Sequence, residues 1–210
     1  MTERGMIFNA EMVRAILDGR KTQTRRLLKD ATGPSLSVDI AEDSPGVAEL
    51  SWLYGDGPGH EVNERIKLIH CPYGKPGDRI WVRETFGDCG VRLVYRADTD
   101  DGAKCKVKRW TPSIHMPRWA SRILLEITDV RVERLNDISE EDARAEGIVD
   151  GGCLNCGEPE PCGCVNPEPD ATDAFAYLWQ SIYGQENWNA NPWVWVIEFK
   201  RIEGAGHETD

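Results

Sequence analysis

The stretch Trp193-Val194-Trp195-Val196-Ile197-Glu198-Phe199 is the strongest strand pattern in the chain and decides the class of fold. Aromatic and β-branched residues dominate it, as is typical of strands. Trp193 and Trp195 alternate with valines, so both point to one side, where we expect core. Working backwards along the chain, the same criteria predict strands over Ile123–Leu135, Val91–Tyr95 and Arg79–Thr85, and a weaker one over Cys105–Trp110.

Helix signals separate these strands. Asn9 is a suitable N-cap for a short helix whose apolar face carries Met12, Val13, Ile16 and Leu17, and Gly19 ends it. Ser139 begins another short helix that ends at Gly147, and a third helix covers Asp173–Tyr183. Ser113–Ala120 resembles a loop broken by Pro117. The polar run after Gly19 is also expected to lie outside the core.

About five short strands with two or three small helices predict a compact barrel of mixed α+β class. We expect one domain over residues 1–203, with insertions at about 30–63 and 149–172 and a disordered polar tail over 204–210. The first insertion is rich in Gly, Pro, Ser and acidic residues without clear periodicity, which is typical of a loop.

Composition narrows the class of protein further. The chain has 210 residues, 40% of them hydrophobic, and no apolar run of membrane-spanning length. Neither a secretory signal nor a disulfide framework is apparent, so we expect a cytoplasmic protein, from a bacterium or a phage-infected cell. The net charge of −11 disfavours coating of a long duplex, yet basic segments at Arg14–Lys29 and Lys104–Arg122 allow local phosphate contacts.

Four of the seven cysteines lie within twelve residues, as Cys153, Cys156, Cys162 and Cys164. Four thiolates suit tetrahedral zinc, and they leave no open position for a catalytic water. The pattern therefore favours a structural zinc that staples the insertion, with no metal required for catalysis. A reduced loop without metal, or a redox pair, is the alternative.

Several blocks of sequence resemble the ASCH domain family, whose fold is a PUA-like β-barrel. The most specific block is Gly19-Arg20-Lys21-Thr22-x-Thr24-x-Arg26 after a short helix. Further landmarks are Gly77-Asp78 before a strand, the helix Ile138–Gly147, and Ile182-Tyr183-Gly184 followed by Val194–Lys200. The blocks cover about half of the chain and match small bacterial members that remove the acetyl group from acetylcytidine. The whole chain is more similar to ASCH-like proteins encoded by phages and prophages.

This resemblance implies Thr24 as nucleophile, Lys21 as its base and Glu146 as proton donor. Partial burial and the neighbouring Arg20, Arg25 and Arg26 would lower the pKa of Lys21. Arg20, Arg25 and Arg26 are also candidate substrate- or RNA-binding residues, and Arg26 could hold an oxyanion or a phosphate. Arg25 replaces an apolar residue of the small members. The residues alone leave a simpler interpretation open, namely a solvated turn at the end of a helix.

The segment Lys104–Arg122 is a second candidate surface because cations there alternate with aromatic residues. Such a pattern suits phosphate contact and base stacking, and its candidate residues are His115, Arg118, Trp119 and Arg122. The alternative is a strand with a solvated basic face and core tryptophans. Glu84, at the outgoing end of a strand, is expected at the surface, although it could face a cleft.

Three functions remain open from the sequence. The first is an amidohydrolase of an acetylated or otherwise modified cytidine, as a nucleoside or in RNA. The second is an RNA- or nucleotide-binding module without catalysis, and the third is a ribonuclease. All three would use the same cleft around Lys21.

Overall fold

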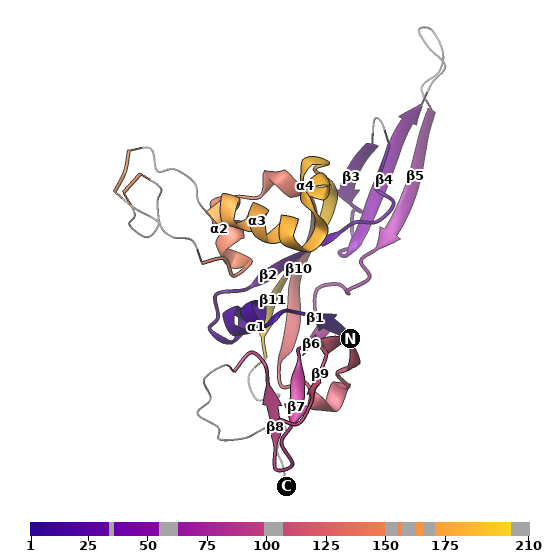
Figure 1. Cartoon of the computed structure of the whole chain (residues 1–210). Coiled ribbons are helices and arrows are strands. Elements are labelled where there is room, and N and C mark those ends of the chain that lie inside the picture. The colour runs from indigo at the N-terminus through magenta and orange to yellow at the C-terminus, as the bar shows by residue number, and fades with distance from the viewer. Residues whose placement is uncertain are drawn as a thin grey trace.

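The computed structural model describes residues 1–33, 36–54, 63–98, 107–149, 155–156, 163–165 and 171–202. Its centre is a five-stranded sheet in the order β1 (Glu3–Ile7), β6 (Arg79–Arg83), β10 (Leu124–Arg134), β11 (Trp193–Arg201) and β2 (Gln23–Leu27). β1 and β6 run parallel, and the other neighbours run antiparallel. The mixed α+β class is confirmed (Figure 1).

The two edge strands of this sheet are joined by α1 (Ala10–Leu17), which begins soon after β1 and ends shortly before β2. The Asn9 side chain caps α1 by accepting from the Met12 amide at 2.8 Å. The sheets formed by the described residues are not closed into a barrel, because no ladder joins β1 to β2. The edges do approach at one point, where Arg26 Nη2 donates to the carbonyl of Ile7 at 3.2 Å.

Strand β11 is buried on both faces, which explains its nearly continuous apolar sequence. Trp195, Ile197 and Phe199 belong to the main core with Val13 and Ile16 of α1. On the other face, Val194 and Val196 pack in a second cluster with Phe175 and Trp179. The expectation that Trp195 lies in the core is confirmed, whereas Trp193 is only partly buried.

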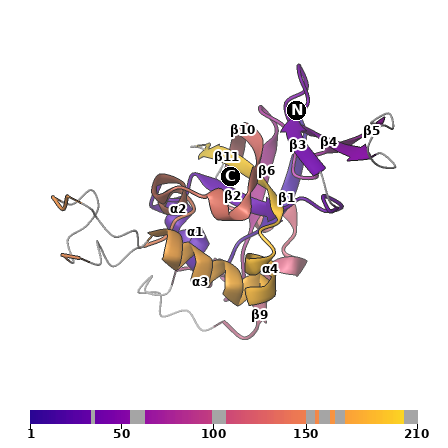
Figure 2. The same cartoon turned by 90° about the horizontal axis from the view of Figure 1, so that it is seen from above.

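The second cluster is covered by helices on one side of the sheet. They are α2 (Glu140–Ala145), α3 (Ala171–Tyr183) and α4 (Gln185–Asn189), seen together in Figure 1 and from above in Figure 2. The Ser139 hydroxyl caps α2 by accepting from the Asp142 amide at 3.1 Å. The predicted positions of α2 and α3 are therefore confirmed, while α4 had no clear sequence signal.

The prediction of a loop over residues 30–63 is wrong for most of this segment. This part of the chain contributes to a three-stranded antiparallel sheet of β3 (Leu36–Ile40), β4 (Val47–Tyr54) and β5 (Asn63–His70). The sheet extends away from the side that carries α2 and α3 (Figures 1 and 2). Val38, Ala48 and Leu50 are buried in the main core. Leu36, Val38 and Ile40 do alternate in β3, but the strand has only five residues, so this period-two signal is short and was missed.

A small sheet and three short helices complete the described chain. They are β7 (Phe86–Asp88), β8 (Leu93–Tyr95), β9 (Trp110–Thr111), η1 (Ser113–His115), η2 (Arg118–Ala120) and η3 (Leu135–Asp137). The strand predicted from Cys105 is only partly testable, since residues 99–106 lie outside the described ranges, as does the tail over 204–210. Within the described ranges, no helix has the length and apolarity needed to cross a membrane.

Candidate active site

Lys21 and Glu146 meet although 125 residues separate them in the sequence. Their backbones form an isolated antiparallel β-bridge, and the ammonium of Lys21 donates to both the carbonyl and the Oε2 of Glu146 at 2.7 Å. Both residues are almost fully buried, with 2% and 4% exposure. The two predicted proton carriers therefore form one buried pair.

Local geometry explains this meeting. Gly19 ends α1 with a φ of 77°, after which the amides of Arg20 and Lys21 both donate to the carbonyl of Ala15. Gly147 ends α2 with a φ of 88°, and a Cβ at this position would lie 3.0 Å from the Cβ of Lys21. Because Gly147 has no side chain, the end of α2 can approach Lys21 closely.

Burial lowers the pKa of Lys21 below the usual value of 10.5, because the charged form loses its hydration. The charge and the hydrogen bond of Glu146 oppose this effect, and the charges of Arg26 and Arg25 reinforce it. The sequence-based expectation of a lowered pKa is thus supported, with burial as the main cause. Arg20 contributes nothing resolved to this shift.

Arg25 contacts the other oxygen of the same carboxylate, Oε1 of Glu146. Its side chain is fully buried and contacts three acids: Glu133 at 2.8 Å, Asp142 at 3.1 Å and Glu146 at 3.4 Å. The interpretation of Arg25 as a substrate-binding residue is not supported by this geometry. Its charge is matched within the protein, as a buried cation requires.

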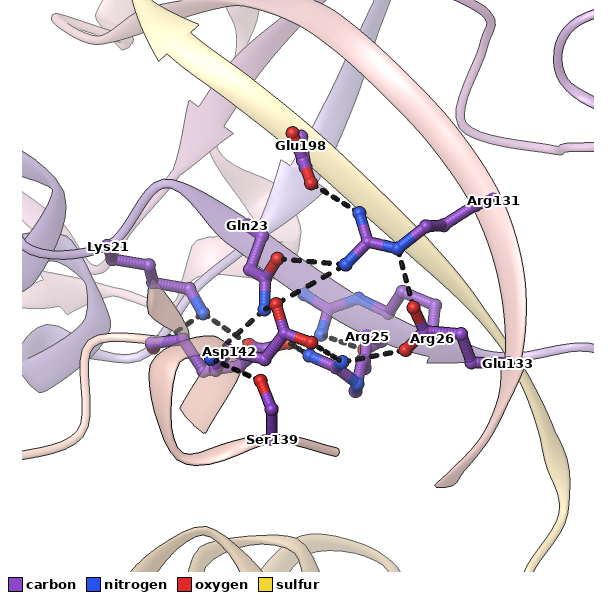
Figure 3. A network of polar contacts seen from close by, with 10 residues as sticks. Lys21, Gln23, Arg25, Arg26, Arg131, Glu133, Ser139, Asp142 and Glu198 are labelled. Carbon is purple, nitrogen blue, oxygen red and sulfur yellow. Dashed lines mark hydrogen bonds and ion pairs between the residues drawn. The ribbon is translucent and has the colours of Figure 1, made fainter. Parts of the chain in front are cut away.

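Arg131 of β10 extends this network, and sequence reasoning missed it. Its guanidinium contacts Glu133 at 2.5 Å, Asp142 at 3.3 Å and also Glu198 (Figure 3). Burial opposes ionisation of Asp142, but the charges of Arg25 and Arg131 and the hydrogen bond from Gln23 lower its pKa. The only sequence signal was the alternation of polar and apolar residues along Val130–Glu133.

Thr24 is fully buried on the face of β2 opposite to Arg25, beside Ile197 of β11. Its hydroxyl has no hydrogen-bond partner among the described residues, and it bonds to neither Lys21 nor Glu146. A buried hydroxyl without a partner is rare because it forfeits its hydration. The structure therefore brings two members of the predicted trio into contact and leaves the third unbonded.

Two adjoining cavities open beside the pair. Glu146 and Arg20 line a cavity of about 400 Å³. Arg26 lines another of about 500 Å³, and both cavities are bounded by Asn9 and Met12. Lys21 and Thr24 line neither of them. A larger cavity of about 670 Å³, near His70, contains none of the predicted site residues.

The described residues of the second candidate surface, Lys104–Arg122, differ in their exposure and in their partners. Trp119 is 62% exposed and His115 is also exposed, which leaves both accessible to a ligand. Arg118 pairs with Glu3 at 3.0 Å on the surface. Lys104 and Lys106, in the basic segment, lie outside the described residues.

Arg122 does not fit the prediction of a nucleic-acid contact. It binds Glu84 at 2.9 and 3.1 Å and Asp98 at 2.7 and 2.8 Å, and it lies 4.0 Å from the centre of the Tyr95 ring. Glu84 is only 2% exposed, so its expected surface position is wrong. A buried carboxylate needs a cation, and Arg122 supplies it.

The predicted zinc ligands are only partly described. Cys153 and Cys162 lie outside the described residues, while Cys156 is exposed and Cys164 is half-buried. Among the described residues, no group of three or more potential ligands is clustered around a metal position. The zinc site therefore stays a prediction.

A scan of the chain against protein-family models finds no match, and searches among curated proteins and solved structures find none either. The resemblance to ASCH domains therefore stays a prediction.

Proposed function

We propose that this chain is an amidohydrolase that removes an acyl group from the exocyclic amine of a modified cytidine. The observation that carries the proposal is the buried pair of Lys21 and Glu146, of which Glu146 lines a cavity. Amide hydrolysis needs a base for the nucleophile and an acid for the leaving amine. This pair can supply both.

The proton between the two groups is central to the argument. The ionised pair and the neutral pair differ by one proton moved along the 2.7 Å contact. Burial lowers the pKa of Lys21 and so favours its neutral amine. A neutral amine can act as a base, and Glu146 lies beside it as the candidate acid.

In the proposed reaction the hydroxyl of Thr24, which is buried and not bonded to Lys21, must first become accessible to the substrate. Its Oγ1 then attacks the acyl carbonyl carbon, and its proton passes to the neutral Lys21. The C–N bond then breaks as Glu146 protonates the leaving amine, which leaves an ester on Thr24. Glu146 next takes a proton from water, the hydroxide attacks the ester, and Lys21 returns its proton to Thr24. Acetic acid is released and both groups regain their initial protons. The unbonded hydroxyl of Thr24 supports its assignment as nucleophile.

The proposal includes membership of the ASCH family with its PUA-like barrel. Two observations support it. The block around Lys21 and the helix that ends at Glu146, both expected from the resemblance, are in contact. The hydrogen bond from Arg26 to Ile7 joins the two edges of the central sheet, as the closing of a barrel would require.

The direct test is incubation of the purified chain with N4-acetylcytidine and with short acetylated and unacetylated RNA, followed by mass spectrometry. Formation of cytidine, or of unacetylated RNA of full length, together with acetate supports the proposal. RNA fragments would instead indicate a ribonuclease, and retention without product a binding module. Either result overturns the proposed hydrolysis.

Variants then test the roles. We expect Lys21→Met, Glu146→Gln and Thr24→Val each to reduce the rate by about 10²-fold or more, as loss of acid–base or nucleophilic groups does. Thr24→Ser should retain activity because it keeps the hydroxyl. Glu84→Gln is the matched control, since Glu84 is another buried carboxylate with a cation partner but outside the site.

A further inference from the structure

Two arginines that line one cavity have no carboxylate partner among the described residues. Arg26 donates to the carbonyls of Arg25 and Ile7, both at 3.2 Å, and Arg83 donates to the carbonyl of Ile114. The Nε of Arg83 is buried and has no hydrogen-bond partner in the described parts of the chain. Carbonyl oxygens satisfy donors but leave the positive charge unmatched.

This arrangement contrasts with the rest of the chain. Acids outnumber bases by 36 to 25, and the partly or fully buried Arg25, Arg122 and Arg131 each contact at least two carboxylates. The chain therefore has enough acids to pair with its buried arginines, yet the two arginines of this cavity have none in the described part of the chain. They leave a local positive potential that attracts an anion.

The cavity has the size and the lining of an anion site. Its volume is about 500 Å³, and its lining includes Tyr73, Tyr183 and Ile182 but neither Asp nor Glu. Burial raises the pKa of Tyr73, so its phenol keeps the proton and can donate a hydrogen bond. Asn9 and Met12 place the first turn of α1 at the same cavity, where helix amides add partial positive charge.

Aromatic rings hold both guanidinium groups in place without neutralising them. The guanidinium carbon of Arg83 lies 5.4 Å from the centre of the Trp81 ring, and that of Arg26 lies 5.5 Å from the Phe8 ring. Trp81 can take this position because Gly5 on β1 has no side chain: a Cβ there would be 2.6 Å from the ring. Planar, pre-oriented guanidinium groups suit the oxygens of a phosphate.

We infer that Arg26 and Arg83 bind the phosphate group of a nucleotide or an RNA, with the hydroxyl of Tyr73 as an additional donor. The inference deepens the proposed function and rests on it for the rest of the ligand. This cavity adjoins the one lined by Glu146 at Asn9 and Met12, so a base near Glu146 can carry its phosphate towards the arginines. The substrate is accordingly a phosphorylated nucleotide or RNA rather than a free nucleoside.

The test measures binding by titration calorimetry and does not depend on turnover. The probes are cytidine, cytidine 5′-monophosphate, a cytidine-containing RNA trinucleotide without terminal phosphates, and inorganic phosphate. We expect each phosphate-containing organic probe to bind about tenfold or more tightly than cytidine, because charge-assisted hydrogen bonds are added. Inorganic phosphate should compete with both. Tighter binding of the monophosphate identifies a terminal phosphate as the ligand, and tighter binding of the trinucleotide an internal one.

Arg26→Met and Arg83→Met should each weaken the phosphate-dependent part of binding by about tenfold and leave cytidine binding unchanged. Arg201→Met is the matched control. Within the described ranges Arg201 also donates only to a carbonyl, that of Leu17, and it lies outside this cavity. An equal loss in Arg201→Met would mean a general charge effect and would overturn the inference. So would the absence of any preference for phosphate in the unaltered chain.

The outcomes separate this inference from the proposed function. Phosphate-dependent binding without release of acetate would leave the phosphate site standing and reject the hydrolysis. Release of acetate at equal rates from acetylated nucleoside and nucleotide, with the same rates in Arg83→Met, would support the hydrolysis and reject the phosphate site.

Discussion

Arg25 Nη1 lies 3.4 Å from Oε1 of Glu146, while the Oε2 of the same carboxylate accepts from Lys21 at 2.7 Å. The carboxyl group of Glu146 therefore lies between two basic side chains. Arg25 connects Glu146 to Glu133 and Asp142, so the candidate proton donor belongs to a network that spans β2, β10 and α2 (Figure 3). Changes in this network should alter both stability and the titration of Lys21.

Replacing Glu146 with Gln removes the partner that raises the Lys21 pKa and leaves burial to lower it. We expect the pKa of Lys21 to fall further below 10.5, measured by NMR of the ¹⁵N-labelled side-chain amine. Glu84→Gln should leave the Lys21 titration unchanged. A Lys21 pKa that stays the same or rises in Glu146→Gln would contradict the assignment of Glu146 as its main partner.

The lowered pKa of Lys21 also predicts a pH dependence of folding. In the pH range between the folded-state pKa and the usual value of 10.5, the unfolded chain binds a proton at Lys21 that the folded chain does not. The free energy of unfolding should therefore decrease as pH falls through this range and level off below it. Urea unfolding at several pH values measures the free energy of unfolding of the unaltered chain and of Lys21→Met. The variant should lack this dependence on pH.

Arg25→Met should strongly destabilise the fold, because it leaves Glu133, Asp142 and Glu146 without a shared cation. Breaking a buried ion pair by removing one partner costs about 3–5 kcal/mol, and chemical denaturation measures it. Lys200→Met is the control: Lys200 is exposed and pairs with Glu126 at 2.9 Å, so its loss should change stability by less than about 1 kcal/mol. Equal effects of the two changes would argue against a structural role for Arg25.

The strands with regular alternation or continuous apolar sequence were predictable. β11 and β10 followed from their own residues, and α1 followed from Asn9, its apolar face and Gly19. In contrast, β2 contains Gln23, Thr24 and Arg25, which were interpreted as too polar for a core, yet all three are buried. The polar groups of Gln23 and Arg25 are paired with acids more than 100 residues away, and no local pattern reports such partners.

The same limit applies to the candidate site. Lys21 and Glu146 were paired through a family resemblance, since nothing in the spacing of the two residues predicts contact. The Arg122 side chain illustrates the opposite error, because a basic residue beside aromatics suggested a nucleic-acid contact. Its carboxylate partner Glu84 directly follows β6, whereas Arg122 shortly precedes β10, and only the fold shows that the two side chains meet.

Arg122→Met should destabilise the chain more at high pH than at low pH. Burial raises the pKa of Glu84, and the hydrogen bonds and charge of Arg122 counteract this effect. Without Arg122 the folded-state pKa of Glu84 rises further above its unfolded value, so stability is retained at low pH and lost as pH rises through it. Urea unfolding at several pH values between 5 and 8 tests this, and the double variant Glu84→Gln/Arg122→Met should lose the extra pH dependence.

Metal analysis tests the predicted zinc staple. Protein purified without added zinc should contain about one zinc per chain if Cys153, Cys156, Cys162 and Cys164 all bind it. A chelator should remove the metal without abolishing acyl hydrolysis, since a four-thiolate site has no open position. Zinc content well below one per chain, or an unchanged content after Cys156→Ser and Cys164→Ser together, would reject the site.

Gly5→Ala should lower both the stability of the fold and the binding of phosphate in the anion cavity. The added Cβ would lie 2.6 Å from Cζ2 of Trp81, so the ring must shift, and overpacking of this kind costs about 1–3 kcal/mol. The guanidinium of Arg83 lies over that ring. A shift of the ring should therefore displace Arg83 and weaken phosphate-dependent binding, while cytidine binding is retained. Gly5→Ala/Trp81→Leu restores the space but removes the stacking partner, so stability should recover more than phosphate binding. If phosphate binding recovered fully in the double variant, the Trp81 ring would not be needed to orient Arg83.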